Sequence, residues 1–163
     1  MGELMSMDIE LVVVGTGEAK YENMFRHNAW CNPKKMSANI MFSNELAHKV
    51  YAACDMFLMP SMFEPCGLSQ IISLAYGTIP IVRETGGLKD TIQPYNQYTG
   101  EGNGFSFYPY TVHDMMYTVS MALGYFADKN VWNGLVKNAL KQDFSWTESA
   151  KQYQAMYDRL LGK

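Results

Sequence analysis

The sequence predicts an α/β protein with a doubly wound, parallel sheet. Short β-branched or apolar runs alternate along the chain with stretches of helical periodicity, and glycine, proline or small polar residues separate them. Strands that alternate with helices connect through right-handed crossovers, so the sheet is mostly parallel and helices cover both of its faces. A length of 163 residues suits one well-buried domain, which we expect over the whole range 1–163.

The N-terminal part of the chain predicts three strands and two helices. Its first β-branched run stops at Gly15-Thr16-Gly17, as a buried parallel strand does. Ser43 precedes apolar residues at helical spacing and is a preferred N-cap residue. The predicted strands cover residues 9–14, 39–42 and 56–59, and the predicted helices cover 18–30 and 43–54.

The C-terminal part predicts two more strands and four helices. A helix that begins after Pro65 and ends at Gly77 carries apolar residues at the spacing of a buried stripe, namely Leu68, Ile71, Ile72 and Ala75. The last helix, over 145–161, opens with Ser145 and Glu148 as a capping box, and we expect Trp146 to anchor it by packing. The other elements are strands over 79–82 and 105–107, helices over 113–126 and 131–140, and a polar loop over 93–104.

The composition argues against several classes of function. A net charge of -3 and a pI near 5.6 disfavour a nucleic-acid partner. The apolar runs are too short to span a bilayer, and residues 1–8 lack the basic and apolar regions of a secretory signal. Cys31, Cys54 and Cys66 show no CxxC pairing, which is typical of reduced thiols in a cytoplasmic protein. The three histidines lie in separate segments, so we expect no bound metal and no cofactor.

The segment after the third strand carries the most informative residues. Pro65 disfavours helical geometry at Glu64 and suits the first position of a helix. The N–H groups of Cys66, Gly67 and Leu68 would then point at a ligand above that helix, while Glu64 accepts hydrogen bonds from its hydroxyls. The alternative, that Glu64 only interacts with the start of its own helix, is equally open on this spacing.

A second candidate segment follows the fourth strand. Paired glycines at Gly86-Gly87 allow a phosphate to approach the backbone closely, and Thr85 adds a hydroxyl donor. Such a segment is more often an ordinary turn. Gly15-Thr16-Gly17 invites a dinucleotide-binding interpretation, but Lys20 stands where the third glycine of that fingerprint belongs, which disfavours an NAD enzyme.

Phe42 and Cys66 each have two interpretations. Phe42 follows the second predicted strand and precedes a helix cap, where it could stack on a base, although phenylalanine there is more often part of the core. Cys66 at a helix N-terminus could be a reactive thiol, but no histidine is near it in the sequence, so a nucleophilic role is the minority interpretation.

Together these segments resemble one family. PSMFEPCGLSQ at residues 60–70 and YGTIPIVRETGGLKDT at 76–91 are similar to the signature of bacterial glycogen synthases and plant starch synthases. LVVVGTGE at 11–18 and FSW at 144–146 match the flanking landmarks, so the resemblance covers nearly the whole chain. Related retaining glycosyltransferases carry a second glutamate eight residues after the first. Ile72 occupies that position here, as in the glycogen synthase branch.

The resemblance implies a fold, an activity and a set of site residues. The family has the two-domain GT-B fold with Rossmann-like halves, and transfers glucose from ADP-glucose to the nonreducing end of an α-1,4-glucan, with retention and without a metal. It implies that Glu64 contacts the donor glucose and that Phe42 packs on adenine. The remaining implied contacts are the sugar-binding N–H groups of Cys66, Gly67 and Leu68, and the diphosphate-binding residues Thr85 and Gly86.

The resemblance also implies what this chain lacks. It corresponds to the C-terminal, donor-binding domain without its first strand and helix, and without the N-terminal domain that holds most of the acceptor site. The usual basic pair at the diphosphate is absent and no substitute pair is identified, although Arg83 and Lys89 are candidates. A sheet without its middle strand would either close by pairing the strands over 9–14 and 56–59, or self-associate through their open edges, which we favour.

Two alternatives stay open at this point. The chain could be a stand-alone module that binds a nucleotide sugar or a glucan without catalysis. It could also belong to a glycosyltransferase of the same fold that uses a UDP-sugar, although FEPCG without the second glutamate argues against this.

Overall fold

A computed structural model describes residues 1–162 of the chain and shows parallel strands that alternate with helices. Lys163, the last residue of the predicted domain, lies outside the described residues. The elements in chain order are α1 (Gly2–Ser6), β1 (Leu11–Val14), α2 (Ala19–Cys31), β2 (Met36–Asn39), α3 (Asn44–Ala53), β3 (Met56–Met59), α4 (Ser69–Ala75), β4 (Ile79–Arg83), α5 (Gly87–Thr91), β5 (Phe105–Phe107), α6 (Val112–Ala127), α7 (Lys129–Leu140) and α8 (Trp146–Leu160).

All of the strand pairs are parallel, as the sequence predicts, but the strands form two sheets. One sheet has the order β1-β2, and the other has the order β3-β4-β5. Among residues 1–162, β1 pairs only with β2, and β3 pairs only with β4. The direct pairing of β1 with β3, one of the two expected outcomes, is therefore absent from this part of the chain.

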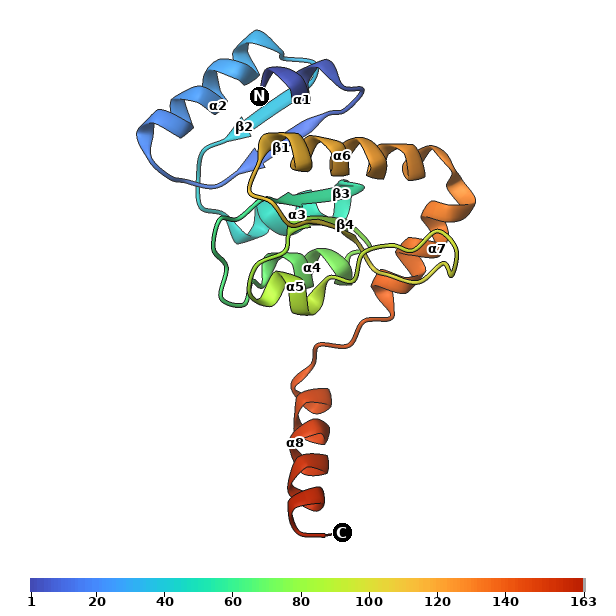
Figure 1. Ribbon diagram of the computed structural model, residues 1–163. Helices are drawn as coiled ribbons and strands as arrows, with labels where there is room; N and C mark the ends of the chain where they lie inside the picture. Colours follow the sequence, from blue (N-terminus) through green and yellow to red (C-terminus); the bar gives the residue numbers. More distant parts are fainter. Residues whose placement is uncertain (163) are drawn as a thin grey trace.

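The core is centred on β4, which has helices on both sides. Ile79, Ile81 and Val82 of this strand are at most 2% exposed. In Figure 1, α6 crosses one face of the three-stranded sheet, and α4 and α5 lie on the other. This arrangement confirms the doubly wound architecture. No helix within residues 1–162 is both long and apolar enough to cross a membrane.

Most of the local predictions are confirmed. β3 and β5 have the predicted bounds, and α2, α6 and α7 agree with prediction to within two residues at each end. Ser43 caps α3, since its Oγ accepts a hydrogen bond from the N–H of Leu46 at 3.2 Å. Gly77 ends α4 at a φ of +74°, a conformation that favours glycine.

The prediction for the second strand is wrong by three residues. The expected range was 39–42, whereas β2 pairs with β1 from Met36 opposite Leu11 to Asn39 opposite Val14. This register buries Met36, which is 6% exposed, and leaves Phe42 beyond the strand. The prediction followed the apolar run that ends at Phe42. It was wrong because the register of β2 depends on the burial of Met36 against the core, which is a tertiary effect.

The prediction for α4 is wrong in its start and in its buried face. The helix begins at Ser69 rather than directly after Pro65, so Pro65 is not at its first position. Its buried residues are Gln70, Ser73 and Leu74, whereas Leu68 is 69% exposed. The buried polar groups are tolerated because they are hydrogen-bonded, as in the contact from Ser73 Oγ to the Gln70 carbonyl at 2.9 Å.

The last helix is capped differently from the prediction, and its apolar side is exposed. Ser145 Oγ accepts from the N–H of Glu148 at 3.3 Å, but the carboxylate of Asp143 takes the N–H of Ser145 at 2.8 Å, while Glu148 pairs with Lys151. Hydrogen bonds from the side-chain hydroxyl and the backbone N–H of Ser145 lower the pKa of Asp143. Trp146 is 89% exposed and α8 projects from the body in Figure 1, so Trp146 is not a packing anchor here.

Candidate functional site

The segments that follow β3 and β4 lie against each other at the carboxyl ends of these strands. The N–H of Gly87 donates to the carbonyl of Pro65 at 3.2 Å. A Cβ at Gly86 would lie 2.0 Å from the Glu64 carbonyl oxygen, and one at Gly87 would lie 2.2 Å from that of Cys66. The two segments are therefore in backbone contact that only glycine permits. We call residues 61–68 the sugar loop and residues 84–87 the phosphate loop, after the roles implied for them.

The two loops present backbone N–H groups without protein acceptors. Within residues 1–162, no hydrogen bond is donated by the N–H of Cys66, Gly67 or Leu68 in the sugar loop. The same is true of Thr85 and Gly86 in the phosphate loop. Unpaired amide groups on two adjoining loops can bind an anion or a polyhydroxylated ligand. The sequence motifs indicate these five residues, and the fold brings them together.

Glu64 supplies the one carboxylate of the sugar loop. Its side chain is half-buried and forms no hydrogen bond or ion pair within the described part of the chain. The alternative that it merely interacts with the start of its own helix gains no support, because α4 begins five residues later. A carboxylate without a protein partner remains available to accept hydrogen bonds from ligand hydroxyls.

Cys66 does not occupy the position that would make it reactive. The thiol was expected at a helix N-terminus, whereas α4 begins three residues after Cys66. Its Sγ lies 3.7 Å from the carbonyl oxygen of Gly67. The helix start that was expected to activate the thiol is therefore not at Cys66, and the backbone N–H is the group of interest there.

Arg83, one of the two basic candidates for the diphosphate site, makes a structural contact instead. Its Nη1 donates to the carbonyl of Met62 at 2.7 Å, and its guanidinium lies 5.2 Å from the centre of the Tyr110 ring. Arg83 therefore holds the sugar loop to the end of β4. Lys89 in α5 is exposed and has no acidic partner within residues 1–162.

Phe42 has an exposed side chain just after β2. It is 84% exposed, which contradicts the alternative that it belongs to the core. It follows β2, in the part of the molecule that carries the two-stranded sheet, and Figure 1 places this part beside the three-stranded one. No aromatic contact within the described residues holds the ring, so it is free to stack on a flat ligand.

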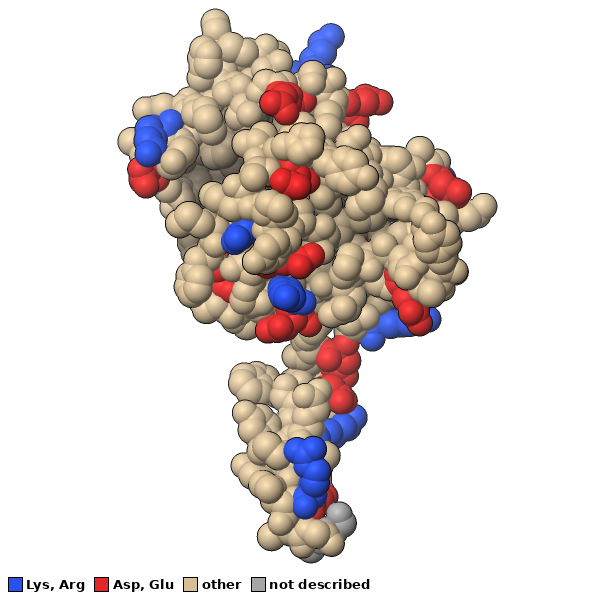
Figure 2. Space-filling view, in the orientation of Figure 1, with Lys and Arg blue, Asp and Glu red and all other residues tan. Residues whose placement is uncertain are grey.

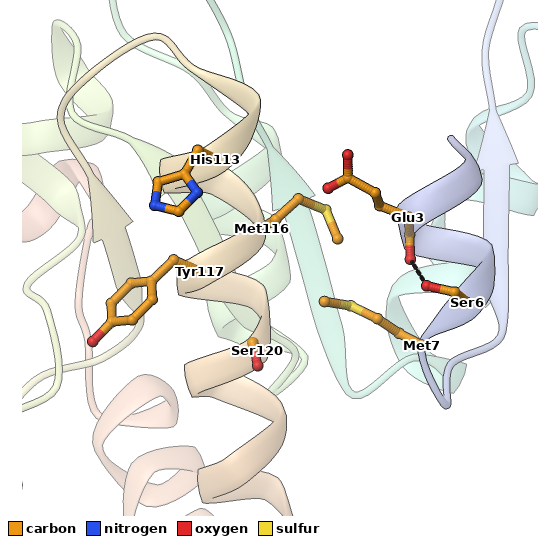
Figure 3. A pocket seen from close by; sticks show the side chains of 7 residues that line it. All are labelled: Glu3, Ser6, Met7, His113, Met116, Tyr117 and Ser120. Carbon is orange, nitrogen blue, oxygen red and sulfur yellow. Dashed lines mark hydrogen bonds between the residues drawn. The ribbon is translucent and has the colours of Figure 1, made fainter.

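Two surface hollows lie away from these loops. One of ≈ 400 Å³ lies between α1 and α6, where Figure 3 shows Met7 and Met116 pointing toward the gap. The other, of ≈ 390 Å³, is lined by polar residues of the loop before β5 and by Asn138 of α7. Neither includes a residue of the sugar or phosphate loop. The two loops lie at the carboxyl ends of β3 and β4. We therefore place the site by the chemistry of these loops rather than by the hollows.

The visible face carries charges of both signs. Figure 2 shows the Lys and Arg side chains of the visible face scattered singly and mixed with acidic ones. Within residues 1–162, no group of three or more His, Cys, Asp or Glu side chains has the arrangement of a metal site.

Comparison with known proteins assigns the family. The family model described as glycosyl transferases group 1 matches residues 3–123, a range that includes both loops and Phe42. The chain belongs to this glycosyltransferase family. Membership confirms, at the level of the family, the resemblance that the sequence motifs indicate.

The most similar relatives of this group 1 chain include glycogen synthases. That of Desulforamulus reducens is 55% identical over 161 residues, which are 99% of this chain and 34% of the relative. That of Clostridium botulinum, strain Alaska E43, is 59% identical over 157 residues, or 96% of this chain and 33% of the relative. The chain thus spans about a third of the length of the curated relatives it matches.

Solved structures support the same fold. The catalytic domain of starch synthase IV from Arabidopsis thaliana, bound to ADP and acarbose, superposes with a TM-score of 0.81 at 32% identity, covering 94% of this chain and 33% of that chain. Sucrose-phosphate synthase from Thermosynechococcus elongatus gives a TM-score of 0.70 at 21% identity, over 99% of this chain and 41% of that chain, which shows a shared fold alone.

Two polar residues of the site region were missed by sequence reasoning. Gln70 is fully buried beneath the sugar loop, and Thr91 of α5 hydrogen-bonds to it. The apolar stripe assigned to α4 placed Gln70 on the solvent side. A glutamine three residues after Gly67, at the start of a short helix, was the available signal.

Proposed function

We propose that this chain is the donor-binding half of a glycogen or starch synthase. The enzyme transfers glucose from ADP-glucose to the nonreducing end of an α-1,4-glucan with retention of configuration. The observation that carries the proposal is the contact between the two loops. Together these loops contain five N–H groups and the Glu64 carboxylate, none of which has a hydrogen-bond partner among residues 1–162. The glycogen synthase relatives, and the starch synthase bound to ADP and acarbose, support this choice of substrates.

Each site residue has a role in this proposal. Glu64 accepts hydrogen bonds from the donor glucose, and the N–H groups of Cys66, Gly67 and Leu68 hold its oxygens. Thr85 and Gly86 bind the diphosphate. The loops act by positioning the donor and by stabilising the negative charge that develops on the departing diphosphate.

The reaction needs no covalent contribution from these residues. The bond between the anomeric carbon and the diphosphate oxygen breaks, and the acceptor hydroxyl oxygen bonds to the same carbon on the same face. The leaving diphosphate takes the proton of that hydroxyl. The proposed acceptor site lies mostly outside this chain. We also propose that the enzyme is cytoplasmic and uses neither a cofactor nor a bound metal.

Transfer assays with the full-length protein test the proposal. Incorporation of glucose into a maltooligosaccharide is measured with ADP-glucose and with UDP-glucose at equal concentrations. We expect ADP-glucose to be the better donor by kcat/KM. Faster transfer from UDP-glucose would refute the donor, and tight binding of ADP-glucose without any transfer would indicate a non-catalytic binding module.

Replacement of Phe42 by alanine tests its proposed stacking on adenine. We expect Phe42→Ala to weaken binding of ADP-glucose by about 1–2 kcal/mol, because stacking and burial of one aromatic ring are lost. Calorimetric titration of the full-length protein measures this, with Met41→Ala as the control at the neighbouring exposed apolar residue. Glucan binding should not change, and an equal loss for both ligands would contradict the stacking role.

The isolated 163-residue chain should self-associate and should not transfer glucose. β1 and β3 each have a strand partner on one side only within the described residues, and free strand edges recruit further strands. Catalysis should fail because an open half-site does not exclude water. Size-exclusion chromatography with light scattering gives the mass, beside a transfer assay on the same sample. A strictly monomeric species, or measurable glucan elongation, would contradict the respective half of this prediction.

A further inference from the structure

A buried hydrogen-bond chain connects the two loops beneath the site. The Nε2 of Gln70 lies 2.9 Å from the carbonyl oxygen of Gly67 and 3.1 Å from that of Cys66, both in the sugar loop. It also lies 3.2 Å from Oγ1 of Thr91. Thr91 Oγ1 in turn contacts the carbonyl of Gly87, at the end of the phosphate loop, at 2.7 Å.

The acceptors determine how these groups are oriented. Carbonyl oxygens can only accept, so the amide nitrogen of Gln70 must face the sugar loop. Thr91 has a single hydroxyl hydrogen, which it donates to the Gly87 carbonyl, so its oxygen accepts from Gln70. The direction of every bond between the sugar loop and the phosphate loop is therefore defined.

The burial of Gln70 is difficult to explain by stability alone. The residue is fully buried, and its Oε1 has no hydrogen-bond donor within the described residues. An unpaired buried carbonyl is unfavourable, and an apolar side chain of similar size would avoid it. What glutamine supplies here, and leucine or methionine could not, is an NH₂ group whose two hydrogens serve the Cys66 carbonyl, the Gly67 carbonyl and Thr91 Oγ1, with one hydrogen shared between two acceptors.

The bonds from Gln70 act on the peptide groups next to the ligand-facing amides. The carbonyl of Cys66 belongs to the same peptide plane as the N–H of Gly67, and that of Gly67 to the same plane as the N–H of Leu68. Holding each carbonyl inward therefore turns the corresponding N–H outward. Gly67 also fits the amide tightly, because a Cβ at this position would lie 2.4 Å from Gln70 Oε1.

We propose that Gln70 and Thr91 form a buried strut that fixes the sugar loop relative to the phosphate loop, and that both are positioning residues for glucosyl transfer. This inference rests on the proposed function. Glucosyl transfer needs both loops in register, because one holds the glucose and the other holds the diphosphate that leaves it. ADP needs the phosphate loop but has no glucose to place in the sugar loop.

This difference supplies a readout that a general loss of stability would not produce. In the full-length enzyme, Thr91→Val removes the hydroxyl while keeping the shape of the side chain. We expect kcat for transfer from ADP-glucose to fall about tenfold, with the dissociation constant of ADP unchanged to within about twofold. Thr91→Ser keeps the hydroxyl and should restore most of the rate, and Gln70→Met should reproduce the loss.

Thr118→Val is the matched control. Thr118 is a buried helical threonine whose Oγ1 also donates to the carbonyl four residues earlier, at 2.9 Å, but it lies in α6 and contacts neither loop. This variant should keep the wild-type kcat. A Thr91→Val enzyme with wild-type kcat would overturn the strut, and so would parallel losses of kcat and ADP affinity in Thr91→Val and Thr118→Val.

The wild-type enzyme separates this inference from the proposed function. If it transfers no glucose from ADP-glucose, the proposed function fails whatever the variants do. If it is active, the ratio of variant to wild-type kcat decides about the strut alone.

Discussion

Replacement of Glu64 by glutamine in the full-length enzyme should lower the rate of glucose transfer by at least about 100-fold, the effect of losing one positioned polar group. The melting temperature should hardly change, because the carboxylate has no hydrogen-bond or ion-pair partner among residues 1–162 to lose. Glutamine preserves the shape of the side chain. It replaces one acceptor oxygen by an NH₂ donor and removes the negative charge that is proposed to face the donor sugar.

Steady-state kinetics with ADP-glucose and thermal unfolding of the same preparation check this prediction. Glu45→Gln is the control, because Glu45 is an exposed glutamate in the first turn of α3 that pairs with Lys49 at 2.6 Å, away from both loops. It should remain fully active. Near-normal activity of Glu64→Gln would remove Glu64 from the site, and a large drop in its melting temperature would assign it a structural role.

The second large effect is expected at the contact between the two loops. Gly86→Ala should destabilise the full-length protein by about 2–4 kcal/mol and abolish most of its activity. The added Cβ would lie 2.0 Å from the Glu64 carbonyl oxygen, which belongs to backbone and cannot move aside as a flexible side chain can. The φ of +45° at Gly86 adds strain for any residue with a side chain.

Urea unfolding measures the loss of stability, and Gly134→Ala is its matched control. Gly134 lies in α7, and a Cβ there would meet no atom within 4 Å. Alanine should therefore stabilise this helix by about 0.5–1 kcal/mol. If Gly86→Ala were as stable and as active as wild type, the two loops would not be in the backbone contact from which the site is built.

Local patterns alone were enough for much of the fold. The β-branched and apolar runs predict β1, β3, β4 and β5, because a buried parallel strand needs little more than a short run of such residues between breakers. Ser43 and Gly77 mark helix ends through hydrogen-bonding capacity and backbone freedom, which are properties of single residues. The motifs around Glu64 and Gly86 likewise indicate the candidate site through the chemistry of their own residues.

Three errors share one cause. The start of β2, the buried face of α4 and the role of Trp146 each depend on what a segment packs against. Met36 defines β2 because the core accepts it, and Trp146 remains exposed because nothing among the described residues covers it. Periodicity reports which face of an element is apolar, but it does not report whether another element meets that face.

The sequence by itself therefore determined the α/β class, the family motifs and the candidate site residues. Only the tertiary structure decided that the sugar loop and the phosphate loop touch, and that Gln70 lies beneath them with Thr91. These residues are 21 apart in the chain. Their hydrogen bond forms because β3 and β4 pair in parallel, so the segments that follow both strands lie at the same end of the sheet. This pairing is a long-range contact that no local sequence pattern encodes.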